Sequence, residues 1–245
     1  MNESVPPPPG WGQDSLTQFL DSVRRNQFAT FANKKLEMKD LISLDSMFTK
    51  LVTDPVTAKL FAPMSFFLRA HSAYRAAVGA VCSGQFYEAQ ALLRSCLEHA
   101  AYAHYVADEP TRYEVWLNRH ESMDTKKSVR TEFLLKKIIE VLTVSSEDLG
   151  SIFTKLYEHT IDYGAHPNER GVSLSSEVVT TDGGGKRFSA IYLQRDGLAL
   201  DLGLKNAAQV GLWALSVAGL IDPARVKRLG IDQGLAEMRR RYLGL

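Results

Sequence analysis

Cysteine is scarce in this chain of 245 residues, which contains only Cys82 and Cys96. If two helices meet in a hairpin at Gly84, the two thiols lie about 15 Å apart along it, because each helical residue advances the chain by about 1.5 Å. That separation excludes a disulfide. Two unpaired, buried thiols are typical of a reducing compartment, and we therefore expect a cytoplasmic protein.

An excess of charge is also absent, because 29 Lys and Arg residues balance 28 Asp and Glu residues. This balance gives no reason to expect a nucleic-acid or membrane partner. Binding to nucleic acid would need a local basic patch, and the arginines at 239–241 form the clearest one. The same arginines also complement the dipole at the end of a helix.

Long apolar runs are missing as well. The longest, "LWALSVAGLI" at 212–221, has about half the length that a bilayer-spanning helix needs. The chain begins without the charged and apolar regions of a signal peptide. We therefore expect no membrane partner.

Known motifs of catalysis and cofactor binding do not occur. The sequence has no phosphate-binding loop, dinucleotide fingerprint, nucleophile elbow or HExxH zinc motif. "DGGGK" at 182–186 lies between two β-branched runs, where a hairpin turn explains it better than a phosphate cradle. We expect no cofactor and no metal, and whether the protein is an enzyme stays open.

The chain is predicted to form one domain after a short lead-in. "PPPPG" near the start excludes a helix and favours an extended, polyproline-like segment. We expect residues 1–12 to be a disordered, proline-rich lead-in and residues 13–245 to form a single domain.

Helical periodicity dominates that domain. Apolar residues recur at i, i+3, i+4 and i+7 from a cap at Asp14 or Ser15 onward, and Asp222 with Pro223 marks the start of a basic last helix. Other helices are predicted at 41–52, 64–84, 85–107, 111–127, 130–142, 145–163 and 198–220. The predicted fold is therefore all-α, a single bundle of about eight helices.

One β-hairpin is predicted to interrupt the helices near residues 172–194. Two β-branched runs flank Asp-Gly-Gly-Gly there, which is the pattern of two strands joined by a tight turn. The hairpin is an insertion in the helical domain.

Polar residues in the helical pair around Gly84 are the first candidates for function. If the pair is an antiparallel hairpin, His71 lies opposite Glu98 and Arg75 lies opposite Arg94. Arg94 and Glu98 are also neighbours one turn apart. These side chains are predicted to form one polar cluster.

Two tyrosines and a later segment extend the candidate site. Tyr87 and Tyr105 lie within about 20° of Arg94 around the helix axis, at about 100° per residue. The segment "LYEHTIDYGAHPNERG" adds two residues on a helix and two on the following loop. These four residues are His159, Tyr163, His166 and Asn168.

Three interpretations of this cluster stay open. The polar groups can form a purely structural network, since buried histidines usually have a satisfied hydrogen bond and Arg–Glu pairs often bridge a helix face. They can line a ligand-binding or catalytic pocket. His71, Glu98, His159 and His166 can also be joined as an acid/base or metal site.

"SGQFYEAQALLRSCLEHAAYAHYVADEP" and, some sixty residues later, "LYEHTIDYGAHPNERG" resemble a group of uncharacterised bacterial helical proteins related to HEPN-type helical bundles. The shared pattern is an Arg and a Glu in an "ALLRxxLE" helix with a later "HP" segment, and it covers roughly residues 65–170. The resemblance implies a helical bundle that forms a homodimer.

RNA cleavage is the activity that the HEPN resemblance implies, without a metal, by an Arg and a His four to six positions apart. Arg94 and His99 have that spacing, but five positions turn two side chains about 140° apart on a helix. Arg94, Glu98 and His166 form the more plausible catalytic set if the protein is a ribonuclease.

Our leading hypothesis is a HEPN-like helical protein that binds a small ligand or a protein partner through the polar cluster. The first alternative is an RNA-cleaving toxin or defence protein. The second is an interaction scaffold, because residues 84–94 resemble the turn and second helix of a tetratricopeptide repeat.

Overall fold

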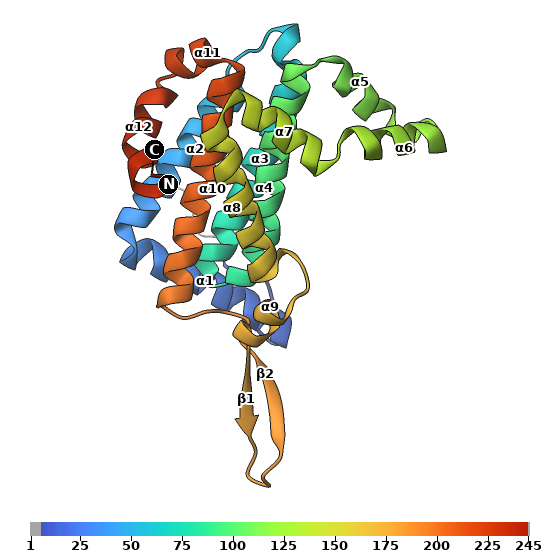
Figure 1. Ribbon diagram of the computed structural model, residues 1–245. Coiled ribbons are helices and arrows are strands. Elements are labelled where there is room, and N and C mark those ends of the chain that lie inside the picture. Colours follow the sequence, from blue (N-terminus) through green and yellow to red (C-terminus); the bar gives the residue numbers. More distant parts are fainter. Residues whose placement is uncertain (1–5, 245) are drawn as a thin grey trace.

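Helices make up most of residues 6–244, the part of the chain that the computed structural model describes (Figure 1). The expected lead-in at 1–12 lies partly outside these residues. Twelve α-helices occur within them: α1 Ser15–Asn33, α2 Lys35–Thr53, α3 Ala58–Ser83, α4 Phe86–Asp108, α5 Thr111–Leu117, α6 Met123–Glu132, α7 Leu135–Ser145, α8 Glu147–Thr160, α9 Glu169–Leu174, α10 Leu198–Ile221, α11 Pro223–Arg228 and α12 Ile231–Tyr242. The prediction of an all-α bundle is confirmed.

The core of the bundle lies between α3, α4 and α10. Phe67 of α3, Leu97 of α4 and Trp213 of α10 are fully buried, and α2 and α8 close the sides (Figure 1). The Trp213 indole donates a hydrogen bond to the Leu149 carbonyl at 2.9 Å, so its one polar group is satisfied. A tetratricopeptide scaffold requires successive helix pairs that stack on one another. Here the helices instead pack around α10.

Helix α10 is apolar because it is a core helix. Its length and composition alone would allow it to cross a membrane, and no other helix of the described chain meets that test. Within the fold, 72% of its most apolar window is buried against the neighbouring helices. Packing inside the bundle therefore accounts for its hydropathy.

The turn between α3 and α4 lies at Gly84, as predicted. Gly84 has φ +91°, a left-handed conformation that glycine adopts without strain. Its carbonyl accepts a hydrogen bond from the Gln194 amide at 2.7 Å, and a Cβ built on Gly84 would lie 2.4 Å from the Gln194 carbonyl oxygen. Two independent reasons therefore favour glycine at this position: the left-handed backbone and the close approach of Gln194.

Capping signals located several helix ends correctly. The Asp14 side chain accepts from the amides of Leu16 and Thr17, both at 2.9 Å, and Asp222 caps α11 with Pro223 in its first turn. The predicted last helix is nevertheless two helices, because Gly230 at φ +67° separates α11 from α12.

The predicted helix at 111–127 is also interrupted. Helix α5 ends in a short 3-10 turn, Asn118–His120, and Ser122 then caps α6 with a reciprocal hydrogen bond to Thr125. The helix predicted at 130–142 begins later, at Leu135. Ser122 was the local signal for this break, and α5 and α6 project from the side of the bundle (Figure 1).

The β-hairpin is present where it was predicted. Strand β1, Ser176–Thr180, pairs antiparallel with β2, Lys186–Ala190, and Val178 lies opposite Phe188. The hairpin projects beyond the end of the bundle next to α9 (Figure 1). Its return strand leads into residues 191–197, which connect β2 to α10.

Both cysteines are free and buried, which confirms the prediction that they do not form a disulfide. Burial raises the pKa of Cys82 to about 11 and that of Cys96 to about 12. Both thiols are therefore protonated at neutral pH, and a protonated thiol is a poor nucleophile.

Replacing Gly84 by alanine is expected to destabilise the fold. The left-handed backbone costs about 1–3 kcal/mol for a residue with a Cβ, and the contact with the Gln194 backbone adds to that cost. Urea denaturation of Gly84→Ala should therefore give a lower free energy of unfolding. Gly219→Ala is the matched control, because Gly219 is helical with open space around it and alanine favours helix by about 1 kcal/mol. Equal stability of both variants would contradict this account.

Candidate functional site

The predicted pair on α4 is present and has a partner from α8. Arg94 Nε donates to Glu98 Oε1 at 2.9 Å, and the Tyr157 hydroxyl donates to the same oxygen at 3.0 Å. The Arg94 guanidinium lies 4.7 Å from the centroid of the Tyr157 ring. We call Arg94, Glu98 and Tyr157 the α4–α8 cluster. The Arg94 and Glu98 side chains remain 29% and 36% exposed, so a ligand can reach them.

Protonation in the α4–α8 cluster is set by its geometry. Burial and the neighbouring Glu98 raise the pKa of Tyr157 to about 12, so the hydroxyl keeps its proton and donates to Glu98. Burial alone would lower the pKa of Arg94, but the hydrogen bond and charge of Glu98 outweigh it and raise that pKa. The cluster therefore contains a fixed guanidinium beside a hydrogen-bonded carboxylate.

The terminal nitrogens of Arg94 distinguish this cluster from the other arginine–carboxylate pairs. Arg75, Arg225, Arg228 and Arg241 each use at least one terminal nitrogen for a carboxylate or a carbonyl. Arg94 uses only Nε, and neither of its terminal nitrogens has a hydrogen bond to any residue of the described chain. Its outer edge is therefore open to a ligand.

His71 and Arg75 do not join this cluster, and the predicted pairing across the helical hairpin is not found. His71 Nε2 lies 2.7 Å from Asp45 Oδ1, and Arg75 Nε donates to the same oxygen at 2.6 Å. The His71 ring also stacks on Phe48, with centroids 5.2 Å apart. The hydrogen bond from Arg75 lowers the pKa of Asp45. Both residues therefore bind α2. The prediction considered only the two helices joined at Gly84 and did not include α2.

Tyr105 also belongs elsewhere. Its hydroxyl donates to Glu132 Oε1 at 2.7 Å, and the Arg112 guanidinium lies 3.9 Å from its ring centroid. Tyr105 and Arg94 do share a direction around the helix axis, but eleven residues separate them by about 16 Å along it. Angular agreement was therefore insufficient for contact.

Tyr87 lies at the other end of α4. Its ring packs edge-on against Phe86, with centroids 5.1 Å apart, and burial raises its pKa. A Cβ on Gly164 would lie 2.5 Å from the Tyr87 carbonyl oxygen, so the π-helical turn after α8 sits directly on this backbone. Tyr87 has a packing role here.

His159 pairs with α10. Asn206 Nδ2 donates to His159 Nε2 at 2.5 Å, and the rings of His159 and Tyr163 lie 4.4 Å apart. Burial lowers the pKa of His159, so the ring is neutral near pH 7 and its Nε2 can accept this hydrogen bond. The pair satisfies the buried Asn206 amide.

His166 and Asn168 lie on the loop after α8, as expected. Asn168 caps α9 by accepting from the Gly171 amide at 2.7 Å, and it donates to the Ile161 carbonyl at 2.7 Å. His166 is exposed, and its Nδ1 bonds the Pro167 carbonyl at 3.2 Å. Neither residue has a hydrogen bond to the α4–α8 cluster.

His71, Glu98, His159 and His166 do not come together as the acid/base or metal site that the sequence suggested. Each has the separate partners described above, and residues 6–244 contain no group of three His, Cys, Asp or Glu side chains that could hold a metal ion. His99 bonds the Ser95 carbonyl of its own helix at 2.6 Å. It does not pair with Arg94.

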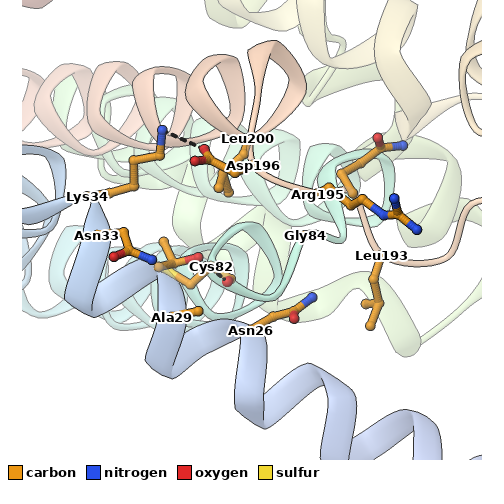
Figure 2. A pocket seen from close by; sticks show the side chains of 12 residues that line it. Asn26, Ala29, Asn33, Lys34, Cys82, Gly84, Leu193, Arg195, Asp196 and Leu200 are labelled. Carbon is orange, nitrogen blue, oxygen red and sulfur yellow. Dashed lines mark hydrogen bonds and ion pairs between the residues drawn. The ribbon is translucent and has the colours of Figure 1, made fainter.

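A pocket that the sequence did not indicate lies between α1, the Gly84 turn and residues 193–200 (Figure 2). Its volume is about 260 Å³. Thr30 Oγ1 donates to the Cys82 carbonyl at 2.8 Å, and Asn26 Nδ2 donates to the Ser83 carbonyl at 2.9 Å, which fixes α1 against the turn. Three segments more than 40 residues apart meet here, so no local pattern could have revealed the pocket.

Charged side chains line the rim of this pocket. Lys34 Nζ lies 2.7 Å from Asp196 Oδ1 and 2.7 Å from Asp201 Oδ1, and these hydrogen bonds raise the pKa of Lys34. Arg195 has no hydrogen bond or ion pair with another described residue. In Figure 2 its side chain points away from the Lys34–Asp196 pair.

Comparison with known proteins adds no relative: no family model, no curated protein and no solved structure matches this chain.

Tyr157→Phe is expected to lower the free energy of unfolding by about 1 kcal/mol at neutral pH, because it removes one hydrogen bond to Glu98. The pKa of Tyr157 is about 12 in the fold and 10.0 ordinarily, so its contribution is complete below pH 10 and is lost as the pH rises toward 12. The stability difference between wild type and variant should therefore shrink over that window. Urea denaturation at several pH values measures it.

Tyr192→Phe is the control for this experiment, since Tyr192 is 67% exposed. It should leave the stability unchanged across the same pH range. A constant deficit of Tyr157→Phe up to pH 12 would contradict the assignment.

Proposed function

We propose that the protein binds a small ligand with a carboxylate or phosphate group through the α4–α8 cluster. The observation that supports this best is the state of Arg94, whose Nε is held by Glu98 and whose face lies against Tyr157 while both terminal nitrogens stay unused. A guanidinium edge of this kind matches two oxygens of a carboxylate or a phosphate.

Preorganisation favours binding at this position. A free arginine loses side-chain entropy when it binds an anion, but Glu98 and Tyr157 already restrict the Arg94 side chain. Glu98 Oε1 accepts both hydrogen bonds, which leaves Oε2 to accept a donor from the ligand. The cluster therefore suits a ligand with a hydroxyl or amine next to its oxyanion.

RNA is the second candidate ligand, because a phosphodiester presents the same oxygens to Arg94. The resemblance to HEPN-type bundles makes this alternative concrete, with Arg94, Glu98 and His166 as the reacting set. His166 is exposed on a loop, and its only described hydrogen bond is to Pro167.

Inorganic phosphate and a labelled single-stranded RNA separate these functions. Phosphate should raise the thermal midpoint of the wild type, since a ligand that binds only the folded state stabilises it. Arg94→Gln should abolish the shift. Arg170→Gln is the matched control, because Arg170 also lies over a tyrosine, 5.4 Å from the Tyr163 ring centroid, and pairs with a carboxylate.

Equal phosphate shifts in wild type and Arg94→Gln would overturn the proposal. Cleavage of the RNA by wild type, lost in Arg94→Gln and kept in Arg170→Gln, would instead support the RNA-cleaving alternative.

A further inference from the structure

Another pocket lies between the start of α8, the end of α10 and the last two helices, α11 and α12. Its volume is about 480 Å³, which falls within the usual range of small-molecule sites, about 300–1,000 Å³. None of the residues that line it belongs to the α4–α8 cluster. The pocket is therefore separate from the site of the proposed function.

Arg239 of α12 supplies a cationic group to this pocket. Its Nε donates to the Ser216 hydroxyl of α10 at 3.3 Å, and Ser216, which is only 3% exposed, lines the same pocket. This hydrogen bond holds the half-buried guanidinium at the pocket wall. Its two terminal nitrogens have no hydrogen bond to any described residue, and neither is sealed from solvent. Both are therefore available as donors to the oxygens of an anion.

The charges around the pocket limit the kind of anion. Lys227 adds a second positive charge, and Asp148 and Asp232 add two negative ones, so the lining as a whole is neutral near pH 7. The guanidinium of Arg239 forms no ion pair with another described residue. One unpaired guanidinium in a neutral lining suits a monoanion such as a carboxylate. A phosphate dianion would bring a second charge that nothing in the lining offsets.

Three helices supply an apolar part of the lining. Leu149 comes from α8, Leu220 from α10 and Val226 from α11. Gly219 also lines the pocket, and a Cβ built on it would meet nothing within 4 Å beyond the backbone of its own helix. Open space therefore lies directly beside this turn of α10. Hydrocarbon placed there is removed from water, which favours a ligand with an apolar body.

We infer that this pocket binds a small carboxylic acid, ionised as a monoanion, with a hydrocarbon body. Its carboxylate accepts hydrogen bonds from the terminal nitrogens of Arg239. Its hydrocarbon lies against Leu220 and in the open space beside Gly219. This site does not depend on the function proposed for the α4–α8 cluster.

Calorimetric titration tests the inference with four probes: hexanoate, acetate, 1-hexanol and inorganic phosphate. Hexanoate should bind, because it has both the charge and the hydrocarbon. Acetate lacks the hydrocarbon and 1-hexanol lacks the charge, so each should bind at least about tenfold more weakly. Phosphate should give no binding that depends on Arg239.

Gly219→Leu fills the pocket without removing a polar group. The new side chain enters the open space beside α10, and leucine favours a helix more than glycine does. The variant should therefore be at least as stable as the wild type and yet lose hexanoate binding. Gly219→Ala is the matched control, because its single methyl group leaves most of the space free, and it should still bind hexanoate.

Two arginine variants identify the group that binds the carboxylate. Arg239→Gln should weaken hexanoate binding about tenfold or more, because it removes a charge-assisted contact. Arg240→Gln changes an exposed neighbour on α12 that does not line the pocket, so it should bind like wild type. Arg94→Gln should also bind hexanoate like wild type, which separates this test from that of the α4–α8 cluster.

Absence of hexanoate binding to the wild type would refute the inference. Equal affinity for hexanoate and 1-hexanol would do so as well, as would wild-type binding by Gly219→Leu or by Arg239→Gln. Loss of hexanoate binding in Arg94→Gln, with Arg239→Gln unaffected, would assign the carboxylate to the α4–α8 cluster and refute a site at Arg239.

Discussion

The left-handed turn at Gly84 is the constraint on which both the α4–α8 cluster and the pocket beside α1 depend. It reverses the chain between α3 and α4, and the Gly84 carbonyl accepts a hydrogen bond from the Gln194 amide at 2.7 Å. The chain reversal sets where α4 begins and therefore which way Arg94 and Glu98 face. The hydrogen bond from Gln194 holds residues 193–196 against the bundle, where they form one wall of the pocket in Figure 2.

Carboxylates that accept from two donors tie the other helices to one another. Each accepts at least one hydrogen bond from an element other than its own, so each links two or more elements. The set is Asp40 with Arg241 and Tyr242, Asp45 with His71 and Arg75, Asp54 with Arg225 and Arg228, Glu98 with Arg94 and Tyr157, and Glu132 with Tyr105 and Lys137. In this group Arg94 alone keeps both terminal nitrogens unused, which is why we place function at the α4–α8 cluster.

Local chemistry allowed much of the fold to be predicted. Asp14, Gly84 and Asp222 act through groups within a few residues, so their roles follow from the sequence near them. The breaks at Ser122 and Gly230 are local as well, and the prediction missed both: the five residues at 118–122 are all polar, and Gly230 lies between α11 and α12. A cap or a glycine inside a periodic segment should therefore count against one long helix.

The sequence by itself determined the all-α class, the β-hairpin, the turn at Gly84 and the Arg94–Glu98 pair, because each depends on residues close in the chain. Only the tertiary structure decided that His71 and Arg75 bind Asp45, that Tyr157 completes the α4–α8 cluster, and that a charged pocket forms beside Gly84. Helical periodicity gives the direction of a side chain around its own axis. It does not say which distant helix lies in that direction, and packing of the whole core makes that choice.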